Sequence, residues 1–323
     1  MPGSSPPPLL SVADLQIGFD FSGTPTPVVR GVSLTIEQGR TVALVGESGS
    51  GKSLTALALM RLLPPSAELM GGSILFEGND LLRLPEDEMR RIRGNRIAMI
   101  FQEPMTSLNP VLKIGVQMIE PLILHRQMSR SDASDYACEL LTSVGIPSPA
   151  ERINSYPHQL SGGMRQRVMI AMALSCTPAL LIADEPTTAL DVTIQAQILH
   201  VLDRLRGEHR MGILLITHDL GIVAERSDQT CIMYAGQIVE KGPTSELMKN
   251  PLHPYTRALL ASLPQNSKPG APLPTLAGNP PSFGSPLFGC GFCNRCPESL
   301  PSCPQSAPPW DERSPGHFIR CWK

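Results

Sequence analysis

Residues 46–53, GESGSGKS, place one lysine at the end of a run of glycine and serine. Glycine leaves the backbone free to approach a ligand closely, and the residues after Lys52 begin a helical pattern. The run fits G-x-x-x-x-G-K-[ST] and follows an apolar segment, TVALVG (41–46). Backbone N–H groups at the positive end of a helix dipole bind phosphate. The segment therefore predicts a nucleotide site; the alternative is a glycine-rich turn with an exposed lysine.

This run, called the phosphate loop below, assigns a role to each residue. Backbone N–H groups from Ser48 to Ser53 would cradle the β-phosphate. Lys52 would reach the β- and γ-phosphate oxygens, and the Ser53 hydroxyl would bind Mg²⁺. The predicted nucleotide contacts in and beside this loop are Gly46, Ser48, Gly49, Ser50, Gly51, Lys52, Ser53 and Leu54.

Two adjacent carboxylates, Asp184 and Glu185, follow four apolar residues in LLIADEP (180–186). At the end of a buried strand, Asp184 suits the outer coordination sphere of Mg²⁺. Glu185 suits a general base that polarises the attacking water. The alternative is an acid that caps a helix, which explains one carboxylate better than two. We therefore predict a hydrolytic site at this strand end.

Two further polar residues also follow apolar runs. Gln102 ends IAMIFQ (97–102), where its amide could ligate Mg²⁺ and sense the γ-phosphate. His218 lies in GILLITHD (212–219), where its imidazole could hold the γ-phosphate or the water. A lone histidine is usually structural, but one at a strand end of the same sheet is a better candidate.

Ser161, Gly162 and Gly163 open a helical pattern, LSGGMRQRVMIAMAL (160–174). They make a second helix N-terminus suited to an anion. The chain has two such helix N-termini but only one lysine loop, so we infer that the second terminus serves a neighbouring molecule. Alone this signal is weak, and an ordinary capped turn is the alternative.

The elements that position these residues can be predicted from apolar patterns. Strands without alternation, separated by helices, indicate an α/β fold with a parallel sheet covered on both faces. The predicted strands are 41–46, 97–102, 180–186 and 212–219, and the predicted helices are 53–63, 162–176 and 193–206. Residues 103–160 are rich in helix formers and predict a helical insertion. Dense prolines after about residue 243 predict a boundary near 240–265, before a loop-rich tail.

Composition limits the class of protein. The chain has 323 residues, 41% hydrophobic and 17% charged, which suits one large globular domain or two smaller ones. A net charge of −2 and 4% aromatic residues argue against a nucleic-acid partner. No run reaches the roughly 18 apolar residues of a transmembrane helix. The N-terminus lacks the features of an export signal, so we expect a cytosolic protein.

These motifs together resemble the ATP-binding subunits of ABC transporters. The resemblance rests on GESGSGKS, Gln102, LSGGMRQ, LLIADEP, ALD (189–191) and His218, in order and spacing. It covers about residues 9–245, after a disordered tail at 1–8. It implies a P-loop NTPase of the ABC type, with a mostly parallel sheet core, an antiparallel β edge and a helical subdomain at about 103–160.

The same resemblance implies a head-to-tail dimer. ATP would lie between the phosphate loop of one subunit and the Ser161–Gly163 signature of the other. Gln166 of the signature helix is expected at the nucleotide, and Asp191 would communicate between the two sites. An aromatic ring is expected to stack on adenine, with Phe19 the best fit and Phe21 the substitute.

FQEPMTSLNP (101–110) and HPYTRALLASLP (253–264) resemble the dipeptide, oligopeptide and nickel importer branch. The tail pattern GCGFCNRCPESLPSC…HFIRC extends that resemblance over residues 246–323, called the C-terminal extension below. It implies a second related ATPase subunit, two membrane permeases and an extracytoplasmic solute-binding protein, with this chain peripheral on the cytoplasmic face of the plasma membrane. Part of 103–160 would receive the permeases. Peptides, nickel, glutathione and antimicrobial peptides stay open as solutes, and a non-transport ABC ATPase is the distant alternative.

Five of the eight cysteines lie in the last 34 residues. Disulfides are disfavoured in a reducing cytosol, so a thiolate metal site is the better interpretation, and it would order a proline-rich tail. The family pattern matches Cys290, Cys296, Cys303 and Cys321, with spacing that suits a [4Fe–4S] cluster better than zinc. Cys293 departs from that pattern and forms a C-x2-C-x2-C run that would compete. Unligated thiols are the third alternative.

Overall fold

The computed structural model describes residues 7–21, 23–103, 107–187, 190–263, 276–282 and 284–323. Residues 1–6 of the predicted disordered tail fall outside these ranges. The chain divides into two units, each with its own packing. The first unit takes in the described parts of Met1–Ile36, Thr41–Leu82 and Ile216–Lys323, and the second takes in Glu37–Arg40 and Arg83–Leu215.

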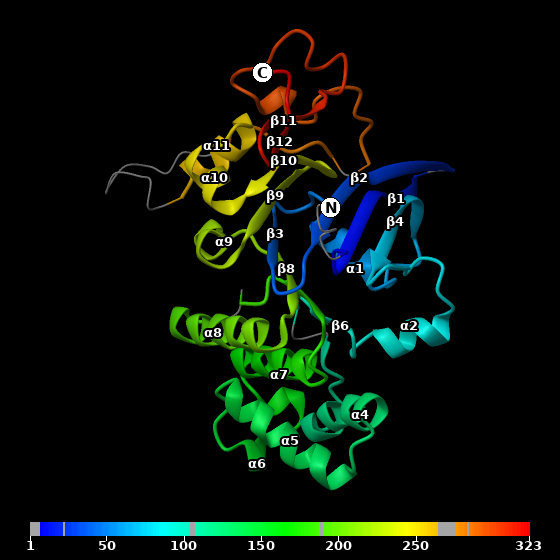
Figure 1. Cartoon of the computed structure of the whole chain (residues 1–323), viewed down its shortest axis with the longest axis vertical. Coiled ribbons are helices and arrows are strands. Elements are labelled where there is room, and N and C mark those ends of the chain that lie inside the picture. The colour runs from blue at the N-terminus through cyan, green and yellow to red at the C-terminus, as the bar shows by residue number, and fades with distance from the viewer. Residues whose placement is uncertain (1–6, 22, 104–106, 188–189, 264–275, 283) are drawn as a thin grey trace, which may run out of the picture. The chain divides into compact units, whose positions relative to one another are not determined.

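An antiparallel sheet in the first unit has the strand order β2-β1-β4-β5 (Figure 1). Its strands are β1 (Leu10–Phe21), β2 (Thr24–Ile36), β4 (Ala67–Phe76) and β5 (Asn79–Asp80). β1 pairs with β2 from Leu10↔Ile36 to Phe21↔Thr24, with bulges on the way. Alternate apolar residues such as Val12 and Ile17 are buried, as expected of a sheet with one face on the core. The resemblance implied an antiparallel β edge, and the structure has this antiparallel β structure as a sheet of its own.

The first unit also contains strands in the order β11-β12-β10-β9-β3. They are β3 (Thr41–Val45), β9 (Gln229–Tyr234), β10 (Gln237–Pro243), β11 (Trp310–Ser314) and β12 (His317–Arg320). β3 runs parallel to β9 and is buried throughout, whereas β10, β12 and β11 pair antiparallel. The helices of this unit are α1 (Lys52–Leu59), α9 (Leu220–Arg226), α10 (Thr244–Lys249), α11 (Pro254–Ala261) and the 3₁₀ turn η3 (Cys293–Arg295).

The second unit has strands in the order β8-β7-β6. These are β6 (Ile97–Ile100), β7 (Leu180–Asp184) and β8 (Gly212–Ile216), all fully buried. β6 and β7 are parallel, from Ile97↔Leu180 to Ile100↔Ala183. The helices are α2 (Glu86–Ile92), α4 (Ile114–Arg126), α5 (Arg130–Ser143), α6 (Pro149–Arg152), α7 (Gly162–Leu174), α8 (Val192–His209) and the 3₁₀ turn η1 (Pro157–Gln159).

The predicted strands match β3, β6, β7 and β8 in position, each shorter at its C-terminal end. The predicted helices match α1, α7 and α8. Within 103–160 the described residues form helices and no strand. No described helix has both the length and the apolar character required to cross a bilayer.

A buried carboxylate attaches the C-terminal extension to the rest of the first unit. Glu240 of β10 accepts hydrogen bonds from the backbone N–H groups of Leu252 (2.8 Å) and His253 (2.9 Å). Its Oε1 lies 2.7 Å from Nε2 of His317 in β12. Glu240 and His317 are both buried, so these contacts have little competition from water. They join β10, the start of α11 and the β11–β12 hairpin.

The extension also shares an apolar cluster with the strands. The rings of Tyr234, Tyr255 and Phe292 pack together with centroids 4.7–5.4 Å apart; Tyr234 meets the other two edge-on, and Tyr255 and Phe292 are tilted against each other. Ala43 and Val45 of β3 belong to the same buried cluster. Residues on both sides of the predicted boundary therefore share one core, and the strand that leads into the phosphate loop borders it.

Candidate nucleotide-binding site

The phosphate loop lies in the first unit, between β3 and α1. Two of its glycines are required by space and backbone conformation. A Cβ on Gly46 would lie 2.1 Å from the carbonyl oxygen of Met233, and Gly51 has φ +103° at the N-cap of α1. A side chain at residue 46 would clash with this oxygen, and one at residue 51 would strain the backbone, so both positions require glycine. The strand–loop–helix arrangement predicted for a phosphate cradle is therefore present.

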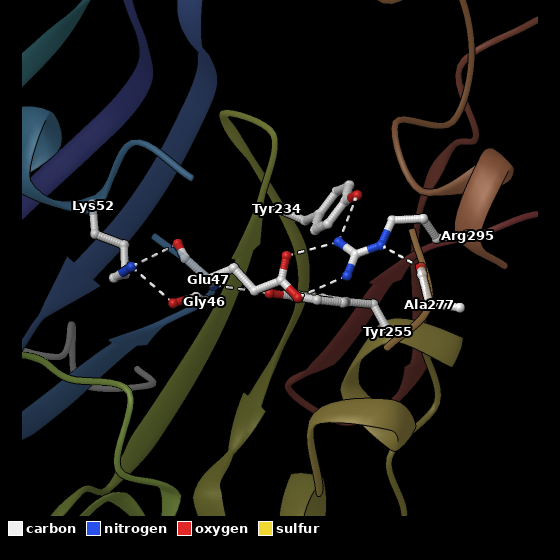
Figure 2. Close-up of polar contacts among 7 residues, drawn as sticks. All are labelled: Gly46, Glu47, Lys52, Tyr234, Tyr255, Ala277 and Arg295. Atoms are coloured by element: carbon white, nitrogen blue, oxygen red, sulfur yellow. Dashed lines mark hydrogen bonds and ion pairs between the residues drawn. The ribbon is translucent and has the colours of Figure 1, made fainter. Parts of the chain in front are cut away.

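The ammonium group of Lys52 lies inside the loop. Its Nζ donates hydrogen bonds to the carbonyl oxygens of Gly46 (2.8 Å) and Glu47 (3.0 Å), as Figure 2 shows. A longer contact of 3.4 Å joins it to Oγ of Ser50, and Lys52 is 7% exposed. Lys52 is thus held among the loop carbonyls, where an arriving phosphate would gain a cation that is already positioned.

The remaining predicted contacts surround this lysine. Ser48 and Gly49 are exposed at the tip, whereas Ser53 and Leu54 are half-buried in the first turn of α1. Ser50 is buried, and its carbonyl oxygen accepts a hydrogen bond from the N–H of Gly236 at 2.9 Å. The loop is therefore attached to the turn between β9 and β10 as well as to its own strand and helix.

Two other predicted residues belong to the first unit. Phe19 is half-buried in β1, opposite Thr26 of β2 and Ala67 of β4. His218 is exposed between β8 and α9, next to Asp219, whose carboxylate caps α9 through the N–H of Gly221 at 2.8 Å. Adenine stacking and phosphate contact stay predictions for these two side chains.

The second unit holds the carboxylates. Asp184 ends β7 and is 3% exposed, and Glu185 follows it with φ +48°. A left-handed conformation costs a glutamate roughly 1–2 kcal/mol, so the fold holds Glu185 in a strained position. Gln102 is exposed just beyond β6, whose Ile100 pairs with Ala183. Because β6 and β7 are parallel, Gln102, Asp184 and Glu185 lie at one edge of the sheet.

The signature residues begin helix α7 in the same unit. Oγ of Ser161 caps this helix by accepting the N–H of Met164 at 3.3 Å, while Gly162 is exposed with open space around it. Gly163, the next residue, is half-buried. This terminus is accessible to another molecule, which the dimer hypothesis requires.

Gln166 and Asp191 have structural contacts that the sequence did not predict. Gln166 is fully buried, and its amide donates to the carbonyl oxygen of Pro186, directly after Glu185. It therefore connects α7 to the segment that carries the catalytic candidates. Asp191 caps α8 by accepting the N–H of Ile194 at 3.0 Å. Nucleotide contact and communication between sites stay predictions for these residues.

The five cysteines of the C-terminal extension line one cavity. The backbone brings two of them together, because the N–H of Cys290 donates to the carbonyl oxygen of Cys303 at 2.7 Å. Burial and the neighbouring thiols raise the pKa of Cys290 to about 11. The predicted metal centre is not supported, because within the described ranges no group of three or more His, Cys, Asp or Glu side chains is arranged to hold a metal ion.

A contact that the sequence analysis missed joins the phosphate loop to the extension. The guanidinium of Arg295 forms two hydrogen bonds with the carboxylate of Glu47, at 2.7 and 3.0 Å. Sequence motifs and periodic patterns relate residues that are close along the chain, whereas these two residues stand 248 positions apart. The available signal was that both lie inside motifs, GESGSGKS and CNRCP.

Two protein families match consecutive parts of the chain. Residues 29–188 match the family described as ABC transporter, and residues 239–303 match the C-terminal region of oligopeptide/dipeptide transporters. The dipeptide transport ATP-binding protein DppD of Bacillus subtilis is 49% identical over 97% of this chain and 94% of its own length. The chain belongs to the ABC transporter family. Its predicted recognition, from the ATPase motifs and the tail together, is confirmed.

Other similar proteins agree with this family. A probable peptide ABC transporter ATP-binding protein of Sinorhizobium fredii is 49% identical over 98% of this chain and 95% of its own. Among solved structures, a dimeric ATP-binding cassette in a post-hydrolysis state with ADP and Pi has a TM-score of 0.67 and 26% identity. It covers 73% of this ABC transporter chain and 98% of its own. The predicted ABC ATPase cassette fold is confirmed.

Proposed function

We propose that this chain is the ATP-hydrolysing subunit of a peptide importer. The supporting observation is the pairing of an ABC transporter match with an oligopeptide/dipeptide transporter match in one chain. The relatives from Bacillus subtilis and Sinorhizobium fredii are named for peptide or dipeptide transport. Nickel, glutathione or antimicrobial-peptide import is the alternative, in which the ATPase chemistry is the same and only the solute differs.

In this proposal the phosphate loop binds ATP. The backbone N–H groups at the start of α1 receive the β-phosphate, and Lys52 exchanges its loop carbonyls for β- and γ-phosphate oxygens. The residues proposed for Mg²⁺ are Ser53 and Gln102, which would offer a hydroxyl and an amide oxygen, and Asp184, whose carboxylate would lie in the outer coordination sphere. When bound, Mg²⁺ neutralises charge that develops on the phosphates.

Hydrolysis is assigned to the residues after β7 and β8. Glu185 accepts a proton from the attacking water, and His218 holds the γ-phosphate or that water in line. Ser161, Gly162 and Gly163 serve the ATP of a second, related ATPase subunit. The exposure of Ser161 and Gly162 at the start of α7 supports this assignment, as does the dimeric state of the similar cassette. Closure of that dimer around ATP then moves the permeases.

Replacement of Glu185 by glutamine tests the hydrolytic role. Glu185→Gln keeps the shape of the side chain but removes its basicity, so ATP binding should persist while steady phosphate release falls on the order of 10²–10⁴-fold. Equilibrium ATP titration and phosphate release on the same preparation measure both. Glu208→Gln, at the exposed end of α8, is the control and should hydrolyse at the wild-type rate. Wild-type turnover in Glu185→Gln would remove Glu185 from this role.

Two permeases and an extracytoplasmic solute-binding protein complete the proposed importer, with this chain at the cytoplasmic face of the plasma membrane. The supporting feature is the outer face of α4. Val116, Ile123 and Leu124 are exposed there, and with Ile119 they line a mostly apolar groove that also includes Glu120 and Arg130. Burial of such a patch against a short permease helix would remove apolar area from water.

A charge in this groove should separate permease binding from ATP binding. Leu124→Glu places a carboxylate where an apolar helix would lie, so recovery of permeases with the tagged chain from detergent-solubilised membranes should fall at least about tenfold. ATP affinity should not change. Leu69→Glu, at an exposed leucine of β4 in the first unit, is the control. Undiminished recovery with Leu124→Glu would place the permease contact elsewhere.

We also propose that Cys290, Cys296, Cys303 and Cys321, which line one cavity but are not arranged as metal ligands in the described structure, would rearrange to hold a [4Fe–4S] cluster or, alternatively, zinc. The support is that these thiols surround one cavity and that thiolate sulfur is the preferred ligand of both centres. Burial raises the pKa of the Cys290 thiol, so a bound cation would have to compensate the cost of its ionisation.

Metal analysis of chain purified without oxygen tests this proposal. A cluster predicts about four iron atoms and about four sulfides per chain, lost in Cys303→Ser. Cys138→Ser, at a half-buried cysteine of α5, should retain them. Bound zinc instead of iron would support the alternative centre, and a metal-free chain with an ordered extension would contradict both.

A further inference from the structure

Arg295 of the C-terminal extension contacts the phosphate loop through the carboxylate of Glu47. Nη1 and Nη2 of its guanidinium each donate to one oxygen of the Glu47 carboxylate, at 2.7 and 3.0 Å (Figure 2). Nη1 also donates to the hydroxyl of Tyr234 at 3.2 Å, and Nε donates to the carbonyl oxygen of Ala277 at 3.0 Å. Such a two-point contact fixes orientation as well as distance.

Burial makes this ion pair different from a surface pair. The side chain of Arg295 is 5% exposed and that of Glu47 is 27% exposed. Exposed pairs contribute little, because water and salt screen them, whereas loss of one partner from a buried pair leaves the other charge uncompensated. The hydrogen bonds to Glu47 raise the pKa of Arg295, which favours its charged form further.

The backbone of Glu47 is held as well. Its N–H donates to the hydroxyl of Tyr255 at 2.9 Å, and Tyr255 is fully buried. Its carbonyl oxygen accepts from Nζ of Lys52 at 3.0 Å and from the N–H of Ser50 at 3.2 Å. Glu47 is therefore held at its carboxylate, its N–H and its C=O, and two of these three contacts come from residues far along the chain.

Charge gives Arg295 a second effect on the loop. Glu47 carries a carboxylate one residue away from Gly46 and Ser48, in a segment proposed to receive several negative charges. Arg295 balances the negative charge of that carboxylate and holds it turned toward the extension (Figure 2). Without Arg295 it would repel an arriving phosphate and would be free to leave its position.

We propose that Arg295 is a positioning residue for ATP binding: it holds Glu47, and through Glu47 the phosphate loop, in the conformation that accepts the nucleotide. This inference rests on the proposed ATP site at Lys52. It also gives the C-terminal extension a part in the ATPase cycle. Arg295 stands between Cys293 and Cys296, so a displacement of that segment would move Arg295 and change its contact with Glu47.

Equilibrium ATP titration of the full chain, with its melting temperature, tests the proposal. Arg295→Met should weaken ATP affinity about tenfold, the equivalent of about 1.4 kcal/mol. Arg295→Lys should lie between Arg295→Met and wild type, since an ammonium restores the charge but not the two-point contact. Tyr255→Phe, which removes one oxygen atom from a buried ring, should also weaken ATP binding and serves if Arg295→Met does not fold.

The double variant separates positioning from general stability. Glu47→Gln combined with Arg295→Met removes the uncompensated carboxylate, so it should bind ATP more tightly than Arg295→Met alone. A role in fold stability alone would raise the melting temperature of the double variant above that of Arg295→Met, while the ATP affinity of the folded protein would be the wild-type value in both. Arg257→Met is the control, because Arg257 pairs with Glu298 within the same extension and does not contact the loop. It should bind ATP as the wild type does.

Lys52→Ala distinguishes failure of this inference from failure of the ATP site. If Lys52→Ala loses ATP binding while folded Arg295→Met and Tyr255→Phe keep wild-type affinity, the positioning role is overturned and the ATP site stands. If Lys52→Ala keeps its affinity, the proposed site is overturned and the inference with it. Loss in Lys52→Ala, a tenfold loss in Arg295→Met and partial recovery in the double variant support both.

Discussion

The phosphate loop depends on a backbone that directs the carbonyl oxygens of Gly46 and Glu47 onto the ammonium group of Lys52. That arrangement is unfavourable for an unsupported chain, because it gathers carbonyl oxygens around one site and requires a left-handed glycine at residue 51. Lys52 satisfies two of the carbonyls, and Gly236 satisfies that of Ser50. Glu47, at the opposite end of the loop from the helix, is held by Tyr255 and Arg295. The conformation that we propose to accept phosphate is thus held by contacts within the chain itself.

The support comes from a segment that has little core of its own. The C-terminal extension is rich in proline and cysteine, and its described residues Tyr255 and Phe292 pack against Tyr234 and the end of β3. Two of the four tyrosines of the chain stand in this one cluster, where their hydroxyls reach Glu47 and Arg295. The same aromatic contacts therefore stabilise the extension and aim the polar groups that hold the loop. The extension and the phosphate loop are coupled for this physical reason.

Features with a local cause were predictable from the sequence. β3, β6, β7 and β8 are buried throughout, so each leaves a continuous apolar run, and the polar residue that follows marks a strand end. The phosphate loop was predictable from the spacing of its glycines and lysine, G-x-x-x-x-G-K-[ST]. The grip of Arg295 on Glu47 was not predictable, because it joins residues 248 positions apart and neither belongs to a periodic pattern. The burial of Gln166 was missed because α7 is apolar on most sides, and the pattern could not tell which side faces Pro186.

Amide hydrogen exchange in the phosphate loop without nucleotide measures most directly whether the loop is held in advance. The account predicts that the N–H groups of Glu47 and Ser50 exchange slowly, because the first is bonded to a buried hydroxyl and the second to the carbonyl of Glu47. Ser48 and Gly49, which are exposed at the tip, should exchange faster until ATP covers them. Exchange of Glu47 and Ser50 at the rate of an unstructured peptide would contradict a preformed loop, whatever affinity the chain has for ATP.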